Sequence, residues 1–298
     1  MEIRLFIGCH FSGQEHLRSQ LEANRPLLDR VGSLVPDQQT ASQALSVALK
    51  AIRKGKANDQ TAPNFISHLT DDKPAKRVLI IAPELTGVLQ RPTKNDKFYP
   101  RANSTIAQIA RQLEGHATVR VFYAIRNPAT FLPTCWTVAL SFQPEMPLET
   151  FLTASNPHNL RWSELLHRIQ GNEDEGVPLT VWDWEGYLRN WRMVAQAFGA
   201  LENKEELVDC GAQLPAEISL KGASLMHAYL QEHPAKDEDT FDKVRTRFEE
   251  KFPLEGLHTL PEIWPEDLVG ELTDAYDDDL YYIERMEGLT FVKAPEYQ

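Results

Sequence analysis

The chain alternates short apolar runs with longer segments whose apolar residues recur every three or four positions. Runs of the first kind predict buried β-strands, and the periodic segments predict amphipathic helices. The predicted strands are residues 3–8, 77–82, 119–125 and 178–182. The predicted helices are residues 14–24, 37–57 and 104–115, a segment opening at Asn127-Pro128 and a segment ending near Gly199.

Strand alternating with helix predicts a parallel sheet, because parallel neighbours are joined by right-handed crossovers. The strands are nearly continuous apolar runs, as expected of a sheet that is covered on both faces. We therefore expect an α/β fold, namely a three-layer sandwich with a central, mainly parallel sheet.

The last third of the chain has a different pattern. It predicts helices at 215–232, 238–251 and 272–287, and one short strand at 289–292. We expect a single domain over residues 1–298, in which a helical region (201–298) packs on the sheet of the α/β core (1–200).

Composition narrows the functional classes. The chain has 298 residues, 42% of them hydrophobic, which suffices for one large core. Its formal net charge of −12 argues against nucleic acid as a partner, because such binding needs a basic face. The three cysteines suggest neither a disulfide framework nor a metal site, so we expect no metal. The apolar runs are too short for a signal peptide or a membrane span, which predicts a cytoplasmic protein; the oligomeric state stays open.

The first predicted strand leads into a glycine-bearing loop and then a helix. This layout offers backbone N–H groups and the positive end of a helix dipole to an anion. It lacks the Gly-Lys-Ser/Thr of a Walker A loop, which disfavours an enzyme that uses ATP or GTP. An ordinary strand-to-helix turn is the alternative interpretation. The candidate binding residues of the loop are Gly8, Cys9, His10, Phe11, Ser12, Gly13, Gln14 and Glu15.

Two other strand ends carry polar residues, and these ends lie at the same edge of a parallel sheet. Glu84 follows the second strand and is a candidate general base, although a solvated glutamate is the commoner case. Arg126 follows the third strand, with Thr134 eight residues later; together they can hold a phosphate group. A surface arginine paired with a carboxylate is the alternative. His10 is the second candidate for proton transfer, although a loop histidine is more often structural.

Cysteines and aromatic residues suggest two further groupings. Cys9 and Cys135 each follow a strand end, so they are either a redox pair or, more commonly, packed thiols. An aromatic cluster from Trp182 to Trp191 is better explained by core packing than by a stacking platform.

In their order and spacing, these segments resemble the PAPS-dependent sulfotransferase family, especially its bacterial branch, whose fold is similar to that of P-loop NTPases. The resemblance spans nearly the whole chain. It rests on the first strand, loop and helix with the stretch to Pro36, residues 79–85, Arg126 with Thr134 and Trp136, residues 214–230, and residues 276–283.

The resemblance implies that PAPS, or its product PAP, binds between the residue 8–17 loop and Arg126 with Thr134. It implies sulfuryl transfer to a hydroxyl of a carbohydrate or small alcohol, with Glu84 or His10 as the base and no metal.

The loop departs from the family's Lys-x-Gly-Thr-Thr-x-Leu. Phe11 occupies the lysine position, and Gln14 and Glu15 occupy the threonine positions. Such transfer depends on neutralising charge on the leaving oxygens, and removing one such donor typically lowers the rate about 10²–10³-fold. Two hypotheses follow. One is an active sulfotransferase in which another cation, such as Arg4, Arg101 or a lysine from the helical region, replaces the missing one. The other is a catalytically inactive descendant that binds a nucleotide or a protein.

Overall fold

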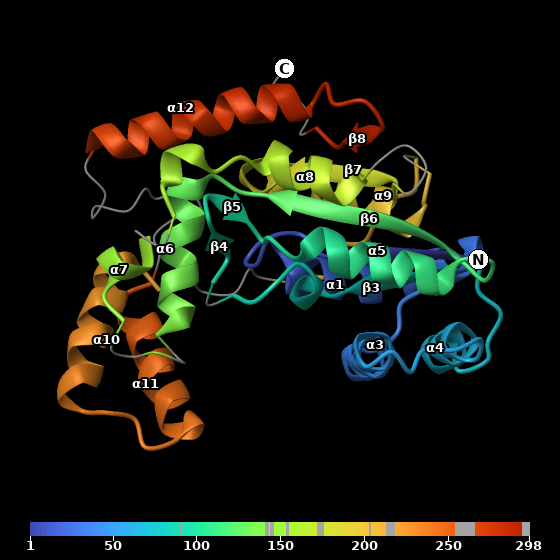
Figure 1. Ribbon diagram of the computed structural model, residues 1–298, viewed down its shortest axis with the longest axis horizontal. Coiled ribbons are helices and arrows are strands. Elements are labelled where there is room, and N and C mark those ends of the chain that lie inside the picture. The colour runs from blue at the N-terminus through green and yellow to red at the C-terminus, as the bar shows by residue number, and fades with distance from the viewer. Residues whose placement is uncertain are drawn as a thin grey trace.

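The computed structural model describes most of the chain, and its centre is a six-stranded sheet (Figure 1). The described residues are 1–89, 91–140, 143, 146–152, 155–171, 176–202, 204–212, 218–253 and 266–293, without the side chains of residues 138, 188, 220, 238 and 266. The strands lie in the order β2 (Ser33–Leu34), β3 (Arg77–Ile81), β1 (Glu2–Phe6), β6 (Thr118–Ile125), β7 (Leu179–Asp183) and β8 (Leu289–Phe291). Every pairing is parallel, so the predicted α/β class and parallel sheet are confirmed.

Alternate side chains of each strand enter two separate cores. Leu5, Ile80 and Val121 belong to one core, whereas Phe6 and Phe122 belong to the other. Successive strand residues point to opposite faces, so a strand must be apolar throughout when both faces are covered. This explains the continuous apolar runs in the sequence.

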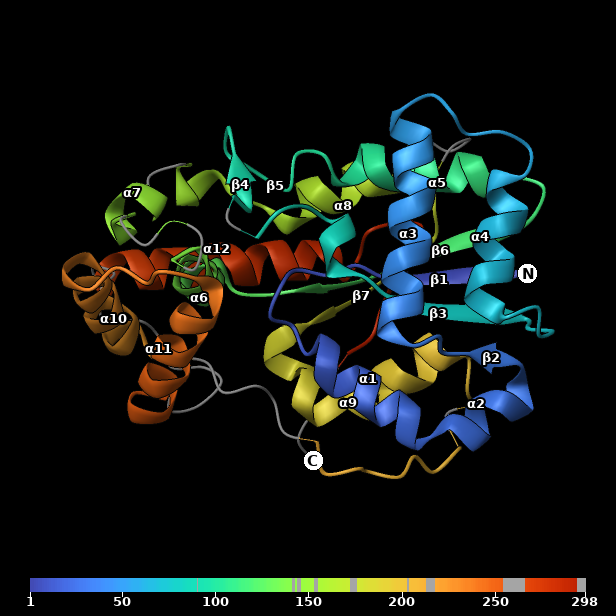
Figure 2. The ribbon, with the colours of Figure 1, turned by 90° about the horizontal axis from the view of Figure 1, so that it is seen from below.

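Helices cover both faces of the sheet, an arrangement compatible with a three-layer sandwich (Figure 2). Helices α1 (Gln14–Ala23), α2 (Arg25–Val31) and α9 (Trp184–Gly199) pack on the face that carries Phe6. The other core receives α3 (Gln38–Arg53), α4 (Thr61–Thr70), α5 (Ala102–Leu113), α6 (Pro128–Ala139) and α8 (Trp162–Gln170).

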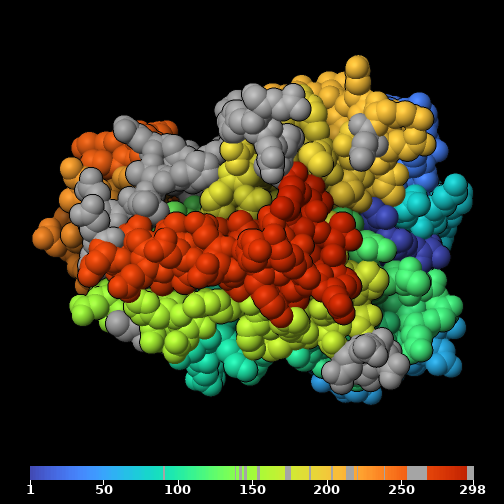
Figure 3. Space-filling view, turned by 90° about the horizontal axis from the view of Figure 1, so that it is seen from above, coloured from blue at the N-terminus to red at the C-terminus, as the bar shows by residue number. Residues whose placement is uncertain are grey.

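The C-terminal region divides between two places. Helices α10 (Leu220–Glu232) and α11 (Glu238–Lys251) pack against each other, and α10 also contacts α6, away from the sheet (Figure 1). Helix α12 (Glu266–Ile283) crosses α6 and α8 and covers the face seen in Figure 3. Strand β8 confirms the predicted strand at 289–292. The start of the predicted helix at 215 lies outside the described residues.

Several short elements were not predicted. They are β2, the hairpin of β4 (Thr93–Lys94) and β5 (Lys97–Phe98), the 3₁₀ turns η1 (Pro83–Leu85) and η2 (Pro157–Asn159), and helices α2, α4, α7 (Leu148–Leu152) and α8. Helix α8 was detectable, because Trp162, Leu165, Leu166 and Ile169 recur at helical spacing and are all buried. Helix α4 was detectable in the same way, because its buried residues Ala62, Phe65 and Leu69 lie on one side of the helix. The other elements are at most seven residues long.

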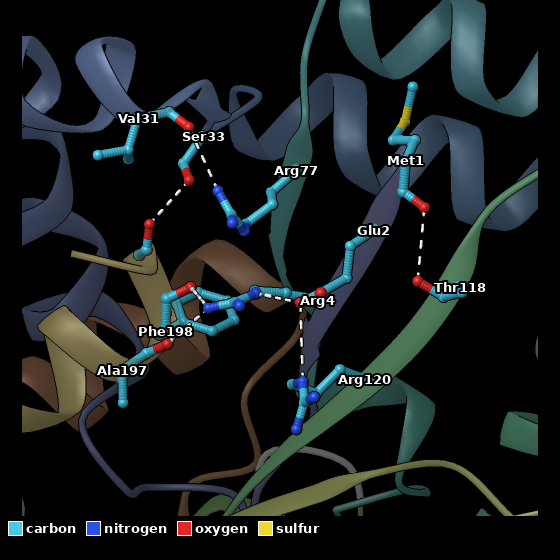
Figure 4. Close-up of polar contacts among 11 residues, drawn as sticks. Met1, Glu2, Arg4, Val31, Ser33, Arg77, Thr118, Arg120, Ala197 and Phe198 are labelled. Carbon is cyan, nitrogen blue, oxygen red and sulfur yellow. Dashed lines mark hydrogen bonds and ion pairs between the residues drawn. The ribbon is translucent and has the colours of Figure 1, made fainter. Parts of the chain in front are cut away.

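Arginines on the strands support the carboxyl-terminal ends of two helices (Figure 4). Arg4 donates to the carbonyl oxygens of Ala197 (2.6 Å) and Phe198 (2.9 Å) near the end of α9, and Arg77 donates to that of Val31 (3.2 Å) at the end of α2. A cation at this end of a helix is favourable, because the helix dipole is negative there. Arg4 also pairs with Glu2. These contacts make Arg4 a structural residue.

Candidate functional site

The predicted loop leaves the central strand β1 between two neighbours. The amides of Ile7 and Cys9 donate to the carbonyl oxygens of Phe122 and Ala124, both at 3.0 Å, so the β1–β6 pairing continues into the loop. A Cβ on Gly8 would lie 2.5 Å from the amide nitrogen of Ala124, so only glycine fits this close approach. Phe11, with φ of 58°, then turns the chain toward α1.

The Gln14 side chain folds back and fills the turn. Its Oε1 accepts from the Ser12 amide at 3.0 Å. Its Nε2 donates to the Cys9 carbonyl at 2.7 Å and to Ser12 Oγ at 3.0 Å. Ser12 Oγ in turn donates to the same Cys9 carbonyl at 2.6 Å. The Ser12 amide, which the sequence offered as an anion donor, is therefore used inside the protein.

Aromatic side chains of α9 close the loop from one side. Gly13 has φ of 81°, and a Cβ there would lie 2.8 Å from carbon atoms of Trp184 and Tyr187. Tyr187 also bonds its hydroxyl to His16 Nδ1 at 3.0 Å. The cluster from Trp182 to Trp191 belongs to the core on this face, as the packing interpretation predicted.

The Arg126 side chain contacts the loop directly. Its Nη1 donates to the Phe11 carbonyl at 3.0 Å, and its Nη2 donates to Thr134 Oγ1 at 3.3 Å. The Nε donates to Thr130 Oγ1 at 3.2 Å. The residue is only 1% exposed. The structure thus brings Arg126, Thr134 and the loop together, with the guanidinium engaged by protein atoms.

A second layer of contacts fixes the backbone around Arg126. Glu185 accepts from the Asn127 amide at 2.8 Å and from the Tyr276 hydroxyl at 2.9 Å, which ties β6 to α9 and α12. Burial raises the pKa of the Glu185 carboxyl, and these hydrogen bonds oppose the shift only in part. Asn127 Oδ1 accepts from the Ala129 amide at 2.9 Å, which confirms the predicted N-cap. Neither Glu185 nor Tyr276 was a sequence candidate, since only the fold brings them to this strand end.

Glu84 lies at the end of β3, in η1, and is exposed. Its surroundings still raise the pKa of its carboxyl through desolvation, and the Arg18 guanidinium lowers it in part. Arg18, a buried residue of α1, donates to the Ile81 carbonyl at 3.2 Å. Glu15, with a side chain 68% exposed, lies 3.8 Å from Arg18. Glu15 therefore faces away from the turn that Gln14 fills.

His10 points to a different partner. Its Nδ1 lies 2.8 Å from the hydroxyl of Tyr99, a residue that is 1% exposed. Burial lowers the pKa of His10 to about 4, so the imidazole is neutral at pH 7. Cys9 and Cys135 are both fully buried in the same core, and neither forms a disulfide.

An open groove with a volume of about 1080 Å³ lies beyond the end of β3. Its lining includes Glu84, Tyr99 and Arg101, so it begins where β3 ends and reaches the first turn of α5. Tyr99 links it to His10. Of the two named cations that the sequence offered for the Phe11 position, Arg101 lies in this groove. Arg4 lies at the other end of α9, about 20 Å from the Trp184 end that contacts Gly13.

Within the described ranges, no three side chains of histidine, cysteine, aspartate or glutamate gather so as to hold a metal ion. No helix in the same ranges combines the length and the apolar character needed to cross a membrane.

No family model, no curated protein and no solved structure matches this chain.

Proposed function

We propose that this chain is a non-catalytic binding protein built on a sulfotransferase-type scaffold, in which the place of the donor nucleotide is closed by the protein's own side chains. The observation that carries the proposal is the position of Gln14. Its amide group satisfies the Ser12 N–H and the Cys9 carbonyl, so a phosphosulfate would have to displace it.

Two features support the scaffold. The first is the strand arrangement, in which β1 is central and the loop after it adjoins the end of β6. The second is the contact of Arg126 with Phe11, because the resemblance assigns these two segments to the two phosphate ends of one nucleotide. In open parallel sheets, ligands bind beyond the carboxyl ends of the strands, where both segments lie.

Three features argue against sulfuryl transfer. Phe11 supplies no charge at the position where the family places its lysine. The Gln14 side chain accepts the hydrogen bond of the Ser12 backbone amide, which would otherwise be able to bind an oxyanion. Arg126 is buried and donates to three protein oxygens. Since each lost donor lowers such rates about 10²–10³-fold, the combined loss would remove measurable turnover.

Nucleotide binding and transfer can be tested together. The wild-type protein is titrated with adenosine 3′,5′-bisphosphate in a thermal-shift assay and incubated with radiolabelled PAPS and a panel of hydroxyl acceptors. We expect no rise in melting temperature at millimolar nucleotide and no labelled product. Transfer of label to an acceptor would overturn the proposal.

A restored loop tests the scaffold itself. The triple variant F11K/Q14T/E15T reinstates the family's residues at the three changed positions. We expect it to gain a nucleotide-dependent thermal shift, because the lysine and two hydroxyls replace the internal contacts of Gln14. The control variant F11K alone leaves Gln14 in place and should gain little. A folded triple variant that binds no nucleotide would contradict the sulfotransferase-type interpretation.

An active sulfotransferase is the second candidate function, and Glu84 is the observation that favours it. The raised pKa of its carboxyl, at the rim of the groove, suits a general base. If the labelled-PAPS assay gave product, Glu84→Gln should abolish most of the rate while leaving nucleotide binding unchanged.

A further inference from the structure

The groove beyond the end of β3 is lined by four basic side chains from three parts of the chain. They are Arg53 in the last turn of α3, Arg91 just before β4, Lys94 in β4, and Arg101 at the start of α5. Arg53 comes from a segment well before the other three in sequence, and the fold brings it to the same groove as Arg91, Lys94 and Arg101. The convergence is notable in a chain with a formal net charge of −12.

These four cations are available for a ligand. All four residues are exposed, and in the described part of the chain none of them forms an ion pair or donates a side-chain hydrogen bond. The nearby Lys97 behaves differently, because its Nζ lies 3.3 Å from a Glu164 carboxylate oxygen. Glu84 is the acidic residue of the groove lining; desolvation raises the pKa of its carboxyl, and the Arg18 guanidinium lowers it in part.

The remaining lining suits a sugar. Thr93, Ser104, Thr105 and Thr150 line the groove with hydroxyl groups, and Met146 and Phe151 contribute apolar surface. The hydroxyls of Ser104 and Thr105 donate to the Arg101 carbonyl oxygen, so they can meet a sugar as acceptors. Hydroxyl groups can bond to those of a sugar, and apolar side chains can contact the C–H faces of its rings. The groove volume of about 1080 Å³ exceeds the space that a single small anion would need.

We infer that this groove binds a carbohydrate that carries two or more sulfate or phosphate groups. Guanidinium groups bind such oxyanions with paired hydrogen bonds, and several cations in one groove favour several anionic groups on one ligand. The inference concerns the groove and not the closed loop, so it does not depend on nucleotide binding.

Calorimetric titration tests the inference with defined probes. The wild-type protein is titrated at physiological salt with a sulfated tetrasaccharide cut from heparin, with the same tetrasaccharide after removal of its sulfates, and with glucose 1,6-bisphosphate. We expect binding of at least one charged probe and none of the desulfated one. Which charged probe binds more tightly distinguishes a sulfated from a phosphorylated ligand.

Matched charge reversals locate the site. The variant R91E/R101E should weaken binding of the charged probe at least tenfold. The control K221E/R247E changes net charge equally on α10 and α11, where both residues are exposed, and should change affinity less than twofold. If R91E/R101E fails to melt cooperatively, R53E/K94E takes its place with the same expectation.

Three outcomes would overturn the inference: no binding of either charged probe at millimolar concentration, equal binding of the desulfated tetrasaccharide, or equal weakening by both pairs of reversals. Equal weakening by both pairs of reversals would mean that the probe responds to the net charge of the protein and does not bind at this groove. None of the three carbohydrate probes contains a nucleotide. A negative result here therefore leaves the proposed closure of the loop standing, and a positive nucleotide assay leaves this inference standing.

Discussion

Arg126 Nη1 donates a hydrogen bond to the Phe11 carbonyl oxygen at 3.0 Å, across 115 residues of sequence. Arg126 follows β6 and Phe11 belongs to the loop after β1, and these strands are parallel neighbours. The buried, charged arginine therefore holds the loop against the sheet. We expect Arg126 to contribute to the stability of the fold, because leaving a buried charge without hydrogen-bond partners costs free energy.

Removing this donor should destabilise the fold. Arg126→Ala leaves the Phe11 carbonyl without its partner, and hydrogen bonds to charged groups contribute about 1.5–3 kcal/mol. Urea unfolding should show a loss of that order. The control Arg120→Ala removes an arginine 35% exposed whose Nε lies 3.7 Å from Glu2, and it should lose no more than about 1 kcal/mol. Equal losses in the two variants would contradict a buried structural role for Arg126.

Gln14 should protect the Ser12 amide from solvent. In Gln14→Ala the acceptor at 3.0 Å is gone, so we expect hydrogen exchange at the Ser12 amide to accelerate at least tenfold. Gln39→Ala, on the exposed side of α3, is the matched control and should leave that exchange rate unchanged. Unchanged exchange in Gln14→Ala would mean that something else closes the turn.

Alanine substitutions at Gly13 and Gly55 distinguish the cost of backbone strain from the cost of side-chain crowding. Both have positive φ, 81° and 62°, but a Cβ meets side chains only at Gly13. Gly55→Ala should therefore lose about 1–2 kcal/mol from the left-handed backbone alone. Gly13→Ala should lose about 1–3 kcal/mol more, because Trp184 and Tyr187 must move. Unfolding curves of the two variants measure the difference, and equal losses would argue against close packing of α9 on the loop.

His10 should make stability fall in acid. Its pKa is about 4 when folded and about 6.5 when unfolded, so between these values the unfolded chain binds more protons. The contribution is complete above pH 6.5 and is lost as the pH falls toward 4. Between pH 7.5 and 5 we expect wild type to lose about 2 kcal/mol more than His10→Asn. Parallel pH profiles of the two proteins would show that His10 is not buried as a neutral group.

The hydrophobic pattern by itself determined the α/β class, the four principal strands and the location of the loop after the first strand. It did so because a strand buried on both faces must be continuously apolar, as at residues 119–125, and because strand–helix alternation permits few connections. The sequence also located Phe11, Gln14 and Glu15, where the loop differs from that of the family it resembles, since this depends only on residue identity.

Only the tertiary structure decided what these residues do. The fold turned Gln14 into the turn and Glu15 outward, buried Arg126 against Phe11, and gathered Arg53, Arg91 and Arg101 around one groove. Local periodicity carries no information on contacts between segments a hundred residues apart. Such contacts are set by the order and register of the strands, and by which side chains remain to satisfy each buried polar group once the sheet has formed.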